Sequence, residues 1–127
     1  MKPELIIMLT NNDITVSNAM EVFESCKDLP AQRWGFKDVG LSKEEMIQLN
    51  KAMKEAGKTT YLEVVTYTEE GCVEGAKLAG ECGFDFLTGT VYYPSINAVL
   101  KQYGLKYFPF PGKVGGSPVA LTGSRRP

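Results

Sequence analysis

The sequence contains no histidine. This absence excludes Ser–His and Cys–His nucleophilic pairs within the chain, and it argues against the usual imidazole-containing zinc sites. The cysteines are also few: Cys26, Cys72 and Cys82 are odd in number and show no Cys-x-x-Cys spacing. We interpret them as small core residues of a protein in a reducing compartment, and we therefore expect a cytoplasmic location.

The sequence also lacks an excess of charge of one sign, and it lacks long hydrophobic runs. The 15 acidic residues nearly balance the 14 basic residues, which gives a net charge of −1. Nucleic-acid binding normally requires a basic surface, so we expect no nucleic-acid partner. The apolar run from Leu5 to Leu9 is too short to span a membrane, and no small-residue cleavage site follows it. We interpret it as a buried strand and expect no membrane partner.

Strands and helices alternate along the sequence. Predicted strands cover residues 4–10, 33–39, 60–66, 84–90 and 105–110, and helices are predicted near 17–27, 42–56, 68–82 and 94–103. Ser42 and Glu45 have the spacing of a capping box, and Gly57, Gly83 and Gly104 each end a helix just before a strand. This βα repeat predicts one α/β domain over residues 1–127 with a parallel sheet and right-handed crossovers. The tail from Gly112 to Pro127 is predicted to be a loop.

Two architectures fit five strands and four helices. One is half of a (β/α)8 TIM barrel, which typically needs about 250 residues, and the other is a complete five-stranded flavodoxin-like open sheet. Lys37 and Glu63 lie within predicted strands. In an open sheet with helices on both faces they would be buried against apolar side chains, which is costly for an unpaired charge. Because a barrel has a polar interior near its mouth, we favour the half-barrel.

One segment resembles the aldolase-type barrels. The stretch Tyr61–Leu62–Glu63–Val64–Val65 is similar to an apolar strand carrying an acid in the deoxyribose-phosphate aldolase group, and Gly83–Phe84–Asp85–Phe86 is similar to the entry into its next strand. The resemblance covers Thr60 to Thr90 and implies a phosphate-binding barrel. That group has its Schiff-base lysine at the position where this chain has Thr88, so an imine mechanism is not carried over there.

The resemblance extends only to the front half of such a barrel. Barrels of this kind usually hold substrate phosphate in the loops after strands seven and eight, which would lie beyond this chain. The sequence ends where a fifth helix is expected. We therefore expect either a homodimer, in which a second copy supplies the other half, or a missing C-terminal half.

Lys37 and Glu63 are the candidate catalytic residues. Neighbouring barrel strands would place both near the carboxyl-terminal mouth, where barrel chemistry occurs. The lysine would act as a base or form an imine, and the glutamate would transfer protons. The alternative is a buried ion pair that only neutralises itself.

Five further residues are candidates for substrate binding. In Pro111–Gly112–Lys113–Val114–Gly115, the lysine would hold a phosphate or carboxylate and the glycine would let the backbone approach it, although a flexible loop explains the same residues. The others lie at strand ends and offer amide or hydroxyl groups, but a turn or a β-forming role explains them equally well: Asn11, Thr88 and Thr90.

We expect no cofactor. No carboxylate cluster has the spacing of a metal site, and convergence of Asp13, Asp38 and Glu63 on a magnesium ion is the alternative. The sequence thus predicts half of an aldolase-type barrel from a lyase or isomerase that acts on a small phosphorylated or carboxylated sugar-like substrate. Two alternatives stay open: a non-catalytic half-barrel that self-associates, and an open-sheet module that binds a small molecule.

Overall fold

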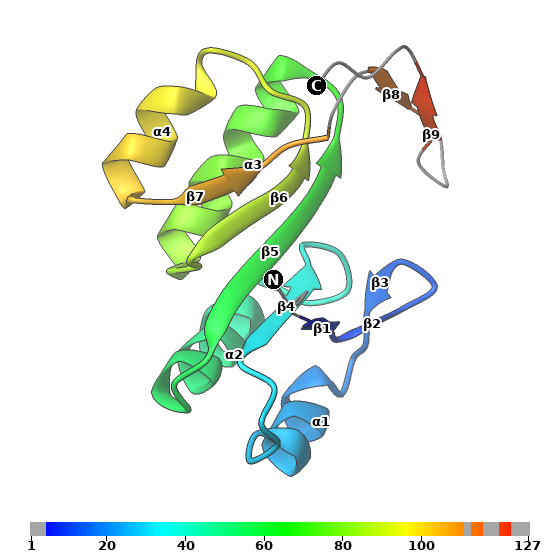
Figure 1. Cartoon of the computed structure of the whole chain (residues 1–127), viewed down its shortest axis with the longest axis vertical. Helices are drawn as coiled ribbons and strands as arrows, with labels where there is room; N and C mark the ends of the chain where they lie inside the picture. The colour runs from blue at the N-terminus through cyan, green and yellow to red at the C-terminus, as the bar shows by residue number, and fades with distance from the viewer. Residues whose placement is uncertain (1–4, 111–112, 116–119, 123–127) are drawn as a thin grey trace.

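The main sheet contains five parallel strands. In a computed structural model of the chain, which describes residues 5–110, 113–115 and 120–122, the strands are β1 (Ile6–Met8), β4 (Arg33–Lys37), β5 (Thr59–Thr66), β6 (Phe86–Thr90) and β7 (Lys106–Phe108). They are hydrogen-bonded in that order, so every strand lies beside its neighbour in sequence (Figure 1). The predicted α/β class and parallel βα repeat are confirmed.

Four helices connect the strands of this sheet. They are α1 (Ala19–Cys26), α2 (Lys43–Glu55), α3 (Glu69–Cys82) and α4 (Ile96–Tyr103). Each helix contacts the next one in the chain, and α2 and α3 also contact the sheet. The helices therefore form one layer on one face of the sheet, with α3 and α4 seen together in Figure 1. Right-handed crossovers between strands in chain order produce this one-sided layer.

Helix ends follow the predicted capping residues. Ser42 Oγ accepts a hydrogen bond from Glu45 N at 3.1 Å, and Glu45 Oε1 accepts one from Ser42 N at 2.9 Å. Thr68 caps α3 through Gly71 N at 3.0 Å. Gly83 and Gly104 take left-handed conformations at φ 86° and 64°, which a side chain disfavours.

The hydrophobic core lies between the sheet and the helices. Trp34 and Phe36 on β4 and Leu62 on β5 are at most 1% exposed and point toward this layer. Trp34 packs edge-on against Phe23 of α1 at a centroid distance of 5.2 Å. Because successive strand residues point to opposite faces, the alternate residues point away from the helices.

No helix among the described residues covers this second face, which we call the open face. It carries two rows of side chains, with members paired across the strands. The first row is Met8, Gly35, Tyr61, Phe86 and Lys106, and the second is Lys37, Glu63, Thr88 and Phe108. Lys37 and Glu63 thus avoid the apolar helix layer, as the energetic argument for the half-barrel required.

Two small hairpins stand apart from the main sheet. One joins β2 (Thr10–Asn11) to β3 (Ile14–Thr15), and the other joins β8 (Lys113–Gly115) to β9 (Ala120–Thr122). The strand predicted over residues 4–10 is therefore shorter, because the chain turns away after Leu9. The prediction that the whole tail is a loop is wrong for β8 and β9. Paired segments of only three residues leave too little alternation in a sequence to be recognised.

The strand order bears on the two architectures. The elements are consistent with half of a barrel and with a five-stranded open sheet. Flavodoxin-type sheets, however, place the second strand outside the first, in the order 2-1-3-4-5. The order here is that of consecutive barrel strands, so it favours the half-barrel. Within the described part of the chain, no helix combines the length and apolar character needed to cross a membrane.

Candidate functional site

Lys37, Glu63 and Thr88 are brought together at the carboxyl ends of three adjacent strands. Lys37 of β4 is the register partner of Glu63 on β5, and Glu63 is the partner of Thr88 on β6. All three lie on the open face. The structure therefore places an amine, a carboxylate and a hydroxyl in one row at the end of the sheet where parallel α/β proteins bind their ligands.

The backbone of Lys37 is held by one threonine. Thr15 Oγ1 accepts a hydrogen bond from Lys37 N at 2.9 Å and donates one to Lys37 O at 2.7 Å. Thr15 is 1% exposed, so both bonds are protected from water. The β2–β3 hairpin is thereby fastened to the end of β4, and it fixes the point from which the lysine side chain extends.

The Lys37 side chain is mostly buried, with 11% of its surface exposed, and its Nζ lies 4.0 Å from Asp13 Oδ1. Asp13 belongs to the hairpin turn and is 78% exposed. At this distance and exposure the pairing is weak. In the described residues no ion pair joins Lys37 to Glu63, so the sequence alternative of a self-neutralising pair does not describe this arrangement.

Glu63 is half-buried, and its carboxylate has no hydrogen bond or ion pair within the part of the chain that the structure describes. Gly89 on β6 packs closely beside it: a Cβ at Gly89 would lie 3.1 Å from Glu63 Cγ and 3.0 Å from Val64 O. Gly89 also has φ of 90°. A glycine is therefore needed both for its backbone conformation and for the room it leaves beside the glutamate.

The other predicted residues are divided among three places. Thr88 is half-buried in the same row as Glu63, whereas Asn11 is exposed in the β2–β3 hairpin. Thr90 is fully buried and its hydroxyl is hydrogen-bonded to Tyr107, so it is not available on the open face. The register shift between Glu63 and Thr66 accompanies this change of side.

Lys113 and Gly115 lie on β8, which pairs with β9. The predicted role of Lys113 depends on its side chain, and that side chain lies outside the described residues. The backbone of Gly115 is paired with Ala120 in the hairpin.

Aromatic rings lie beside the Lys37 row and at its end. Tyr61 stacks on Phe86 with centroids 4.5 Å apart, and Phe86 stacks on Phe108 at 5.4 Å. The interplanar angles are 10° and 5°, so the three rings are nearly parallel. Arg33 donates a hydrogen bond to the Tyr61 hydroxyl. Tyr61 and Phe86 give the polar row an apolar boundary on its amino-terminal side, and Phe108 ends the row next to Thr88.

The carboxylates considered for magnesium do not form a metal-binding group. Asp38 is half-buried next to Lys37, but it lines a groove with residues of the helix layer. Within the described residues, no three His, Cys, Asp or Glu side chains are arranged to hold a metal ion. Buried Cys72 and Cys82 are free thiols, and burial raises the pKa of both. Thiolate chemistry is therefore disfavoured at these two positions.

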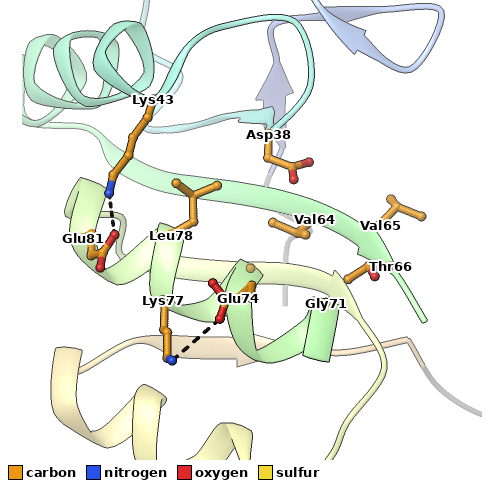
Figure 2. A pocket seen from close by; sticks show the side chains of 11 residues that line it. Asp38, Lys43, Val64, Val65, Thr66, Gly71, Glu74, Lys77, Leu78 and Glu81 are labelled. Atoms are coloured by element: carbon orange, nitrogen blue, oxygen red, sulfur yellow. Dashed lines mark hydrogen bonds and ion pairs between the residues drawn. The ribbon is translucent and has the colours of Figure 1, made fainter. Parts of the chain in front are cut away.

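Sequence reasoning missed this groove. It has a volume of about 490 Å³ and lies between α2, α3 and the carboxyl half of β5 (Figure 2). Asp38, Val64 and Thr66 line it from the strand ends, and Gly71 and Glu74 line it from α3. The small residues Gly71 and Gly75, four positions apart on α3, were the available signal, since they let the helix approach the strand closely.

Comparisons of the sequence with models of known protein families and with curated proteins give no match. The function must therefore be argued from the geometry of the site.

Proposed function

We propose that the open face at the carboxyl ends of β4, β5 and β6 is a small-molecule site for proton transfer next to a carbonyl group. The observation that carries the proposal is the register: Lys37 and Glu63 are direct neighbours across β4 and β5, yet no ion pair joins them in the described residues. The Glu63 carboxylate therefore has no competing partner among the described residues, and the Lys37 ammonium has only the weak 4.0 Å pair with exposed Asp13.

The roles follow from the charges of the two groups. Glu63 removes a proton from the carbon next to the carbonyl, and the Lys37 ammonium donates a hydrogen bond to the oxygen on which negative charge develops. The Thr88 hydroxyl orients a substrate hydroxyl. Return of the proton to a neighbouring carbon completes an isomerisation. In the lyase alternative, Glu63 instead removes the proton of a hydroxyl on the β carbon. The bond between the α and β carbons then breaks to give an aldehyde and an enolate, and the enolate takes up the proton at its α carbon.

The substrate class follows from the same groups. A small hydroxylated carbonyl compound fits the amine, hydroxyl and carboxylate row, and a phosphate or carboxylate on it supports binding to the cationic Lys37. The chain then acts as half of an aldolase-type barrel, in keeping with the resemblance of residues 60–90 and with the strand order. We propose no cofactor for this chemistry.

Proton exchange in D2O tests the proposal. Dihydroxyacetone phosphate and pyruvate are incubated with the protein, and deuterium uptake next to the carbonyl is followed by NMR. We expect uptake above the buffer rate, with a loss of about 100-fold or more in Glu63→Gln. Lys37→Met is expected to slow uptake as well. Glu44→Gln, an exposed carboxylate in the first turn of α2, is the matched control and is expected to retain the wild-type rate.

Two results would contradict the proposal. One is uptake at the buffer rate with both compounds, and the other is equal uptake in Glu63→Gln and the wild type. Borohydride reduction in the presence of pyruvate distinguishes hydrogen bonding by the Lys37 ammonium from imine formation at Lys37. Only the imine is reduced to a stable adduct, which increases the mass of the wild-type protein but not that of Lys37→Met.

A second candidate function is self-association without catalysis. The observation in its favour is apolar exposure at both edges of the sheet: Leu5, just before β1, is 75% exposed, Ile6 on β1 is 37% exposed, and Phe108 on β7 is 60% exposed. Unpaired strand edges with exposed apolar residues favour association. In this proposal a second copy places its β1 against β7 and so continues the parallel sheet.

A further inference from the structure

The groove between α2 and α3 has mixed walls. Its apolar part is formed by Val64 on β5 and by Leu78 and Gly75 on α3. Its polar part includes Asp38 at the end of β4 and Thr66 at the end of β5. Figure 2 shows the Asp38 carboxylate and the Thr66 hydroxyl on the strand side of the hollow, across from Glu74. A volume of about 490 Å³ is within the range of small-molecule sites.

Ion pairs already account for the cations that line the groove. Lys43 Nζ lies 2.5 Å from Glu81 Oε1, and Lys77 Nζ lies 3.8 Å from Glu74 Oε1. Both pairs are visible as dashed lines in Figure 2. Each lysine is thus matched by one glutamate. The remaining charge of the lining is the carboxylate of Asp38.

Asp38 and Thr66 offer unused hydrogen-bond acceptors. Within the part of the chain that the structure describes, no other residue donates a hydrogen bond to the Asp38 carboxylate or to the Thr66 hydroxyl. The carboxylate interacts with the N–H of its own residue, and Asp38 N also donates to Glu63 O at 3.3 Å. Burial raises the pKa of Asp38, while the residue's own backbone N–H and then the nearby Lys37 charge oppose that rise. A half-buried carboxylate that receives no hydrogen bond from another residue is stabilised when a cation approaches it.

We propose that this groove binds a small organic ammonium compound, with the ammonium against Asp38 and Thr66 and a short aliphatic chain over Val64 and Leu78. The ammonium supplies three donors to the two unused acceptors, and the apolar chain covers the side chains on the groove floor. Anions are rejected because Asp38 is the uncompensated charge. The inference does not depend on the proposed function, since none of the residues lining the groove has a role in the proposed proton transfer.

NMR titration of the 15N-labelled full chain tests the proposal with n-butylammonium as the probe. We expect saturable shifts of the Thr66, Gly71 and Gly75 amide signals, at least fivefold larger than those caused by n-butanol or butanoate. Methylammonium is expected to bind several-fold more weakly, because it lacks the chain that contacts Val64 and Leu78. Equal shifts with n-butylammonium and n-butanol would overturn the proposal, and this comparison needs only the wild-type protein.

Asp38→Asn supplies the decisive variant. It keeps the size of the side chain and removes its charge, so we expect at least a tenfold loss of n-butylammonium affinity. Glu44→Gln is the matched control and is expected to bind as the wild type does. Unchanged binding in Asp38→Asn would overturn the proposal. If that variant fails to fold, which circular dichroism detects, the comparison of n-butylammonium with n-butanol still decides.

Discussion

Lys37 and Asp38 show how two consecutive residues reach different surroundings. Lys37 ends β4 on the open face, whereas Asp38 lines the groove beside the helix layer. The alternation of side chains along an extended chain accounts for this separation. A short stretch of sequence therefore supplies one charge to the proposed proton-transfer site and another to the proposed ammonium site.

The raised pKa of Asp38 predicts a pH-dependent effect of Asp38→Asn. Burial raises this pKa above the ordinary value, so the folded state holds the proton more tightly than the unfolded state does. The ionised carboxylate therefore destabilises the fold at pH 7, and this penalty disappears as the pH falls below the ordinary carboxyl pKa. We expect Asp38→Asn to raise the melting temperature at pH 7 but not near pH 3.5. A lowered melting temperature at pH 7 would contradict this reasoning.

At the residue scale, the sequence predicted which side chains share a face of the sheet where simple alternation holds. The positions of Lys37 and Glu63 on one face follow from regular strands that pair in register. Thr90 could not be placed in this way, because Gly89 has φ of 90° and the register between β5 and β6 shifts before Thr90. The ion-pair partner of Lys37 could not be predicted from the sequence either. Asp13 approaches Lys37 because it lies in a hairpin turn in which Asn12 and Asp13 both have positive φ.

At the scale of elements, α3 depends on glycine for its contact with the sheet. A Cβ at Gly75 would lie 2.8 Å from Val64 Cγ1. Contacts this short force the neighbours to move, and Val64 is only 4% exposed. The helix can lie so close to β5 only because this position has no side chain. Capping signals predicted where α3 begins and ends, but they carry no information on how deeply it packs.

A double-mutant cycle measures this contact. Gly75→Ala gains about 1 kcal/mol of helix propensity, but overpacking against Val64 costs about 1–3 kcal/mol, so we expect a net loss of stability. In the Val64→Ala background the obstruction is removed, and Gly75→Ala is expected to be neutral or stabilising there. Urea denaturation gives the four free energies of unfolding. Additive effects of the two substitutions would show that Gly75 is not in contact with Val64.

For the whole molecule, the order of the strands could be predicted from the sequence, but what lies against the two outer edges of the sheet could not. Glycines before strands and alternating hydrophobic patterns indicated the βα repeat. What lies against the outer edges of β1 and β7 depends on pairing between segments that local sequence signals do not specify. The open face, with Phe108 exposed at one edge and Ile6 at the other, leads to a prediction for the assembly.

Light scattering across a wide concentration range tests self-association. We expect a mass that rises from one chain toward two, with Phe108→Asp shifting the equilibrium toward one chain by at least tenfold. Ile47→Lys is the matched control, because Ile47 is 37% exposed but belongs to α2 in the helix layer. A mass of one chain at all concentrations would refute the dimer, and an equal effect of both substitutions would place the interface elsewhere.

The strand order β1-β4-β5-β6-β7 also has a consequence for biosynthesis. Within this sheet each new strand pairs with the sheet strand made before it, and only the short β2–β3 hairpin is made between β1 and β4. Every pairing in the sheet therefore joins strands that are close in the chain. Most loop closures are therefore short, which favours rapid folding. The sheet can grow from its first strand while the chain is still emerging from the ribosome, each βα unit using the previous one as its template.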